Sequence, residues 1–171
     1  MIKTMGILII ILSSTALGFM LAENIKKRYI QLKELQAAVF QLQNEVFYTR
    51  TELPEAFRRV GDKCKFPINN LFNNVSRMLV ENEINSVYEA FDYSMDKDKN
   101  LYITNEDKDI LLNLARSLGE SDLEGHRNSF ELTNNDLKYR IEEVNMKLNK
   151  DKKMYRYLGF SFGAVVAILL I

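Results

Sequence analysis

Hydrophobic residues recur at alternating spacings of three and four along most of the central chain. This spacing is typical of α-helices that pack along one face. Two long seams stand out, one within residues 24–49 and the other within residues 123–148. The first seam consists of Leu32, Leu35, Val39, Leu42 and Val46, and the second includes Phe130, Leu137, Ile141, Val144 and Leu148. The sequence therefore predicts a long helix near each end of the central region.

Shorter amphipathic segments lie between these two seams. Pro54 fits the first turn of a second helix with Thr51 as its cap, and Pro67 opens a third helix. A fourth helix is expected to start at Ile84 or Asn85, and residues 95–100 form a polar loop.

A fifth helix begins at Thr104. Asp107 stands three residues later in a variant of the capping box. Gly119 is placed as the C-terminal cap of that helix, and Ser121 caps the last helix. No segment has the pattern of a strand, so the predicted fold class is all-α, a bundle of about five to six helices.

Both ends of the chain carry uncharged apolar runs. Residues 5–22 hold no charge, and a helix of that length reaches ~27 Å, close to the thickness of a bilayer core. Residues 157–171 are also uncharged but reach only ~22 Å, so they need local thinning or snorkelling to span. The expected organisation is a transmembrane anchor at 5–22, a helical bundle at 23–156 and a second anchor at 157–171.

Basic clusters flank both runs on the side of the bundle. They lie at residues 26–28 and 147–156. By the positive-inside rule both clusters are cytoplasmic, which places both termini outside and the bundle inside. Two alternatives stay open: residues 1–20 as a cleaved signal peptide, and the tail as a buried core helix. The signal peptide is disfavoured because the charges follow the apolar run rather than precede it.

Composition excludes several functions. Lys and Arg number 23 and Asp and Glu number 23, so no net positive field favours nucleic acid as a partner. Cys64 is the single cysteine and His126 the single histidine, too few for a disulfide framework or a cysteine-rich zinc site. The lysines on either side of Cys64 favour a lowered thiol pKa, but no base stands at motif spacing.

No catalytic motif is present in the sequence. Residues 96–107 resemble the start of a calcium loop, but Leu101 and Asp107 replace the Gly and Glu that such a loop needs. Walker, GxGxxG and GxSxG motifs are absent from the sequence. We therefore expect no enzymatic activity, no cofactor and no metal.

Charge distribution points to a binding surface. Residues 81–124 hold 12 acids and 4 bases, which predicts a molecule that is basic at the membrane and acidic at its distal part. The distal acids either avoid anionic lipid or form a docking face for a basic partner. The candidate docking residues are Glu81, Glu83, Glu89 and Asp92. Arg50, Arg58 and Arg59 offer a second face.

Two more candidate residues lie on the first long seam. A carboxylate at Glu45, near Leu42 and Val46, needs a partner if it is buried. That partner is either a structural hydrogen bond within the chain or a group on a binding protein. Tyr48 lies three residues further along the chain and is grouped with it as a candidate partner contact.

Several stretches carry a family resemblance in order along nearly the whole chain. They are GFMLA (18–22), LKELQAAVFQLQNEVFYTRTELPEAF (32–57), FPINNLF (66–72), EDKDILLNLARSLGESDLEGH (106–126) and LGFSFGAVVAILLI (158–171). Together they resemble the stage III sporulation protein AB family of endospore-forming bacteria. Family-typical positions include Gly18, Phe19, Leu42, Glu45, Tyr48, Leu53, Pro54, Leu118, Gly119 and Asp122.

The resemblance implies a role in endospore formation. The family is expected in the mother-cell membrane around the forespore, as a platform component of a channel or secretion-like apparatus. Its helical domain is similar to the cytoplasmic domain of F-type platform proteins of type II secretion. The implied partners are a cytoplasmic ATPase of the stage III sporulation protein AA type and other membrane components of the channel. A generic membrane-anchored adaptor without an ATPase, and an extracytoplasmic domain, are the alternatives.

Overall fold

The structure is a computed structural model of the 171-residue chain. It describes the backbone of residues 2–84, 86–120 and 123–170, and the side chains of residues 23–84, 86–119 and 125–150. These residues form helices and connecting segments without a strand. The helices are α1 (Ile2–Phe47), α2 (Leu53–Lys63), α3 (Ile68–Val80), α4 (Val87–Lys97), α5 (Asn105–Glu120) and α6 (Leu123–Leu170). The all-α prediction is confirmed.

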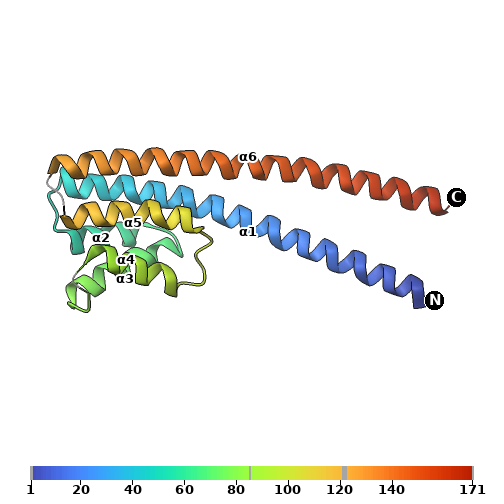
Figure 1. Ribbon diagram of the computed structural model, residues 1–171, viewed down its shortest axis with the longest axis horizontal. Helices are drawn as coiled ribbons and strands as arrows, with labels where there is room; N and C mark the ends of the chain where they lie inside the picture. The colour runs from blue at the N-terminus through green and yellow to red at the C-terminus, as the bar shows by residue number, and fades with distance from the viewer. Residues whose placement is uncertain (1, 85, 121–122, 171) are drawn as a thin grey trace.

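The two long helices form an antiparallel pair with the short helices along one side (Figure 1). Each helix packs against the next in the chain, and α6 returns to pack against α1. The short helices lie alongside the pair (Figure 1). Both termini lie at the same end, beyond the short helices (Figure 1). Helix α1 runs unbroken from Ile2 to Phe47.

Within the side chains that are described, no helix is long and apolar enough to cross a membrane. The two predicted spans, residues 5–22 and 157–171, lie outside those side chains. Their prediction therefore still rests on the sequence alone.

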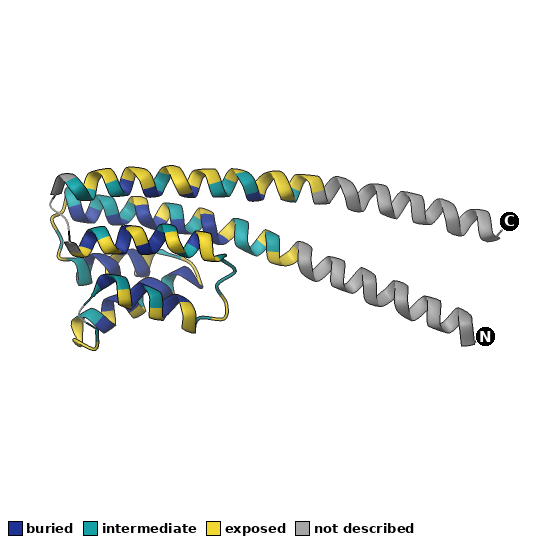
Figure 2. Ribbon diagram, viewed as in Figure 1, coloured by how far each residue is buried: buried dark blue, intermediate teal, exposed yellow. Residues whose placement is uncertain are grey.

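The core follows the predicted seams. Leu32, Leu35 and Leu42 of α1 are fully buried against the rest of the bundle. The buried positions Phe130, Leu137 and Val144 of α6 follow one another at intervals of seven residues. Figure 2 shows buried positions facing inward on each described helix, with exposed ones outside. A second focus of packing is a group of three aromatic rings on three different helices, namely Phe57 of α2, Phe72 of α3 and Phe91 of α4.

Several predicted helix ends differ from the structure by a few residues. Glu52, not Thr51, is the cap residue of α2, because the Thr51 hydroxyl donates to Glu45 instead. Ser86 precedes α4, which continues to Lys97 into the segment predicted as a loop. One half of the predicted capping box of α5 is present, since the backbone N–H of Thr104 donates to the Asp107 carboxylate over 2.9 Å. The predicted cap at Ser121 lies outside the described residues.

Gly119 was predicted to cap α5, and this is wrong. It lies inside α5, which extends to Glu120, and no described glycine has a positive φ. A Cβ placed at Gly119 would have no neighbour within 4 Å. At Gly61 of α2 the space is filled, because a Cβ would lie 2.7 Å from the Cγ and 3.1 Å from the backbone N of Asn73 on α3. Of these two glycines, Gly61 therefore permits close packing between helices and Gly119 does not.

Alanine substitutions at these two glycines are expected to act in opposite directions. Gly61→Ala should lower the free energy of unfolding by about 1–3 kcal/mol through overpacking. Gly119→Ala should raise it by about 0.5–1 kcal/mol, the usual gain in an exposed helix. Urea unfolding followed by circular dichroism measures both. Gly61→Ala should cost less in an Asn73→Ala background, and equal costs in both backgrounds would contradict the proposed clash.

Candidate partner-binding site

The predicted acidic face divides into two parts. Glu81 and Glu83 lie in the turn between α3 and α4, where the Arg77 guanidinium binds both of them. The N–O distances are 2.9 Å to Glu81 and 3.0 Å to Glu83. This arginine offsets part of their charge, so the turn is a weaker attractor for a basic partner than its sequence suggests.

The remaining two acids lie on α4. Glu89 and Asp92 line a surface hollow of about 370 Å³ together with Ile84, Tyr93, Asp96 and Lys97. Among the described side chains, neither Glu89 nor Asp92 forms an ion pair. The Lys97 ammonium lies 5.0 Å from the centre of the Tyr93 ring. The structure thus brings two unpaired carboxylates together with an exposed aromatic ring, which we call the α4 face (Glu89, Asp92 and Tyr93).

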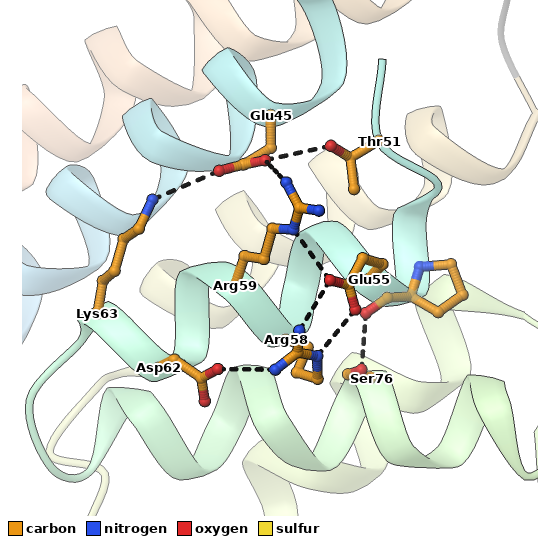
Figure 3. A network of polar contacts seen from close by, with 9 residues as sticks. Glu45, Thr51, Glu55, Arg58, Arg59, Asp62, Lys63 and Ser76 are labelled. Carbon is orange, nitrogen blue, oxygen red and sulfur yellow. Dashed lines mark hydrogen bonds and ion pairs between the residues drawn. The ribbon is translucent and has the colours of Figure 1, made fainter. Parts of the chain in front are cut away.

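Glu45 belongs to a different place, at the far end of α1. Figure 3 shows its carboxylate between Thr51, Arg59 and Lys63. The Thr51 hydroxyl donates over 3.2 Å, Arg59 over 3.3 Å and Lys63 over 3.4 Å. The residue is buried, so these groups supply the partners that its position required.

The same network engages the basic residues of α2. Glu55 accepts hydrogen bonds from Arg58 over 2.8 Å and from Arg59 over 2.9 Å, and Arg58 also binds Asp62 (Figure 3). The predicted second face around Arg58 and Arg59 is therefore largely compensated within the helix.

These contacts shift the pKa of both glutamates. Hydrogen bonds from Arg58 and then Arg59 lower the pKa of Glu55 to about 2. For Glu45, burial alone raises the pKa, but the hydrogen bonds from Thr51 and Lys63 outweigh it, and the pKa is lowered overall. Both groups are therefore carboxylates at neutral pH, and Glu45 ties the end of α1 to α2.

Tyr48 is far more accessible than Glu45. It follows α1 and is 84% exposed. It lines one end of a groove of about 910 Å³ between α1 and α6. Phe40 and Phe47 of α1 line the same groove, as does Arg127 of α6. The structure therefore separates Tyr48 and Glu45, which the sequence had grouped together.

The sequence did not reveal a buried ion pair between α1 and α5. Asp107 is completely buried, and the Arg28 guanidinium binds both of its oxygens, over 2.7 Å and 2.9 Å. This hydrogen bonding raises the pKa of Arg28, against the opposing effect of burial. Asp107 therefore holds α5 against α1 as well as capping α5. The acidic segment is accordingly not wholly distal, because the start of α5 lies beside the basic cluster of α1.

Further contacts fasten the linker before α5 to the same part of α1. The Gln31 side-chain amide donates to the Asn100 carbonyl over 2.8 Å and accepts from the Tyr102 N–H over 2.7 Å. The Lys27 ammonium lies 4.7 Å from the centre of the Tyr102 ring. Residues 27–31 thus anchor the connection between α4 and α5. The sequence did not predict these contacts, because Lys27 and Gln31 were interpreted only as residues next to a predicted membrane span.

The described residues give little support to a reactive thiol at Cys64 or to a metal site. Burial, followed by the charge of Glu34, raises the pKa of Cys64 to about 11, so the predicted lowering by Lys63 and Lys65 is wrong. No group of three potential ligands for a metal ion occurs among the described side chains.

The profile of the stage III sporulation protein AB family matches residues 3–171. The chain belongs to this family. Stage III sporulation protein AB of Bacillus subtilis (strain 168) is 26% identical over 171 residues, which cover 99% of each chain. A solved structure of Stage III sporulation protein AB (SpoIIIAB) aligns with a TM-score of 0.66 and 21% identity. That alignment covers 72% of this chain and 97% of the other, and it supports the fold.

Within this member of the stage III sporulation protein AB family, the family-typical positions fall into different environments. Leu42 and Leu118 are buried in the core. Glu45 holds the network around α2, and Gly119 is exposed within α5. Tyr48 is the most exposed large hydrophobic residue among those described. Packing within the described residues does not explain this exposure.

Proposed function

We propose that this protein is a non-enzymatic platform component of the sporulation apparatus that docks a cytoplasmic ATPase of the stage III sporulation protein AA type. Its family is named for a stage of sporulation. The sequence holds no nucleotide-binding motif, so energy for any transport has to come from a partner. The single observation that carries the proposed docking is the α4 face, with its two unpaired carboxylates.

We further propose that the bundle is cytoplasmic and anchored at both ends in the mother-cell membrane around the forespore. Support comes from the uncharged runs at 5–22 and 157–171 and from the basic clusters beside them. The exit of both long helices at the same end of the molecule (Figure 1) is compatible with two anchors in one bilayer.

The contacts between helices could transmit a displacement of the α4 face to the membrane end of α1. Helix α4 continues into the linker that Gln31 and Lys27 hold to α1. The next helix, α5, is fixed to α1 through Asp107 and Arg28. A displacement of α4 would therefore act on α1 close to its predicted entry into the bilayer, through hydrogen bonds rather than a loose connection.

Charge reversal on α4 tests the docking. The variant Glu89→Lys with Asp92→Lys should bind the ATPase at least about tenfold more weakly, because like charges then face each other. Binding by the unchanged protein should weaken as salt rises. The measurement is the affinity of the full-length protein, in detergent or membrane vesicles, for the purified ATPase.

The matched control is Glu52→Lys with Asp109→Lys. Both residues are exposed, lie outside α4 and give the same change in net charge. This control should bind normally. Equal binding by both variants would reject the α4 face as the docking site. No binding by the unchanged protein would reject the ATPase partner and favour an adaptor without one.

A further inference from the structure

Helix α6 carries a stripe of large hydrophobic side chains that face away from the bundle. Leu132, Tyr139 and Met146 follow one another at intervals of seven residues. They are 64%, 67% and 66% exposed, although the seam of Phe130, Leu137 and Val144 on the same helix is buried. A heptad repeat of exposed apolar residues is the pattern of a helix that packs against another helix. We call these three residues the outer stripe.

Acidic residues surround the outer stripe. The charged residues three or four positions from its members are Asp136, Glu142, Glu143 and Lys150. Three acids therefore accompany one base. Asp136 and Glu142 are exposed, whereas Glu143 is paired with Arg140 and Lys147.

The groove between α1 and α6 has the opposite character. Its charged lining residues are Lys33, Arg127, Lys138 and Glu131, three bases to one acid. Its apolar lining includes Phe40, which is 60% exposed, and Ala37. The groove is long, runs between two helices and has no occupant within the chain's described residues. Its charge and its aromatic wall thus complement the outer stripe.

The groove and the outer stripe also lie at similar positions along the axis of the α1–α6 pair. Gln36 of α1 donates to the Asn134 carbonyl of α6 over 3.3 Å, and the rings of Phe47 and Phe130 meet 5.7 Å apart. Phe40 lies between Gln36 and Phe47 along α1, and Leu132 lies between Phe130 and Asn134 along α6. They are therefore at similar heights along the pair. Two copies anchored in one membrane would bring Phe40 of one to the height of Leu132 of the other.

We propose that the groove receives the outer stripe of a second copy of this chain. The packing is antiparallel between α1 of one copy and α6 of the next, which repeats the α1–α6 pairing inside each copy. Because each copy presents one groove and one stripe, the contact is heterologous and adds further copies in a ring or row. The equal height of the copies rests on the membrane anchoring proposed above.

Cysteine cross-linking between two copies tests this contact. Two full-length chains with different tags, both carrying Cys64→Ser, are co-expressed, one with Phe40→Cys and the other with Leu132→Cys. Membranes are then treated with a short bismaleimide. A cross-linked product carrying both tags is expected. Phe40→Cys paired with Tyr93→Cys is the control, because Tyr93 is 47% exposed but lies on α4.

Three results would overturn the proposal. One is a yield no higher than that of the control. Another is preferred cross-linking between two Phe40→Cys chains, which would mean that like grooves face each other. The third is cross-linking of Phe40→Cys to a different protein alone, which would assign the groove to another occupant.

Charge exchange provides an independent readout. Lys33→Glu with Lys138→Glu in the groove copy should reduce the cross-link roughly fivefold, the scale of exposed ion pairs. Asp136→Lys with Glu142→Lys in the stripe copy should restore it. Absence of restoration would refute charge complementarity as the basis of the contact.

The ATPase assay separates this inference from the proposed function, because it reads the α4 face. Loss of the cross-link with normal ATPase binding rejects the contact between copies alone. A chain that stays out of the membrane fraction contradicts the anchoring, and with it the argument from equal height. A cross-link without ATPase binding rejects the docking alone.

Discussion

Replacing Asp107 with alanine is expected to lower the free energy of unfolding of the bundle by about 3–5 kcal/mol. The substitution leaves the Arg28 guanidinium, which is 16% exposed, without its carboxylate. It also removes the acceptor for the Thr104 N–H at the start of α5. A partly buried charge left without its partner and a lost helix cap act together here. Urea unfolding of residues 23–156, followed by circular dichroism, measures the loss.

Asp109→Ala is the matched control. Asp109 is exposed on the same helix, so its removal should change the free energy of unfolding by no more than about 0.5 kcal/mol. Arg28→Met should be costly too, since it leaves the carboxylate buried alone. The double variant Arg28→Met with Asp107→Ala should cost less than the sum of the two single changes. Additive costs would show that the two residues do not act as a pair.

The long helices could be predicted because their buried hydrophobic residues recur at a regular helical spacing in the sequence. Leu32, Leu35 and Leu42 are buried as the three–four spacing requires, and so are Phe130 and Leu137. Helix ends were harder, because they depend on contacts with other elements. Thr51 has the chemistry of a cap, but its hydroxyl finds Glu45 instead.

The ion pair of Arg28 and Asp107 could not be predicted for a different reason. The two residues lie 79 positions apart, and each had a sufficient local explanation. Arg28 stood in a basic cluster beside an apolar run, and Asp107 stood at the capping position of α5. Tertiary packing joined them, and no periodicity records such a pairing.

The candidate site was predicted in part. Net charge located an acidic region, and α4 does carry two unpaired carboxylates. The sequence could not show that Arg77 compensates Glu81 and Glu83, because that contact depends on the turn between α3 and α4. The outer stripe of α6 was hidden for a related reason. Period alone does not distinguish the buried seam from a second, exposed one on the same helix.

Phe57→Ala is expected to have the other large effect on stability, a loss of about 3–5 kcal/mol. Phe57 is fully buried, and its ring lies 5.5 Å from that of Phe91 and 6.3 Å from that of Phe72. The alanine would leave a cavity where α2, α3 and α4 meet. Phe66→Ala, at a residue that is 61% exposed, is the control and should change stability by no more than about 0.5 kcal/mol.

The same substitution connects the core to the α4 face. Phe91 projects from the helix that carries Glu89 and Asp92, so loss of its contact with Phe57 removes part of what orients that helix. At temperatures where Phe57→Ala is still folded, we expect weaker ATPase binding but unchanged salt dependence, because the carboxylates remain. Phe57→Leu, which keeps most of the volume, should recover much of the stability and the binding. A stability loss below about 1 kcal/mol for the alanine variant would contradict the tight packing of the three rings.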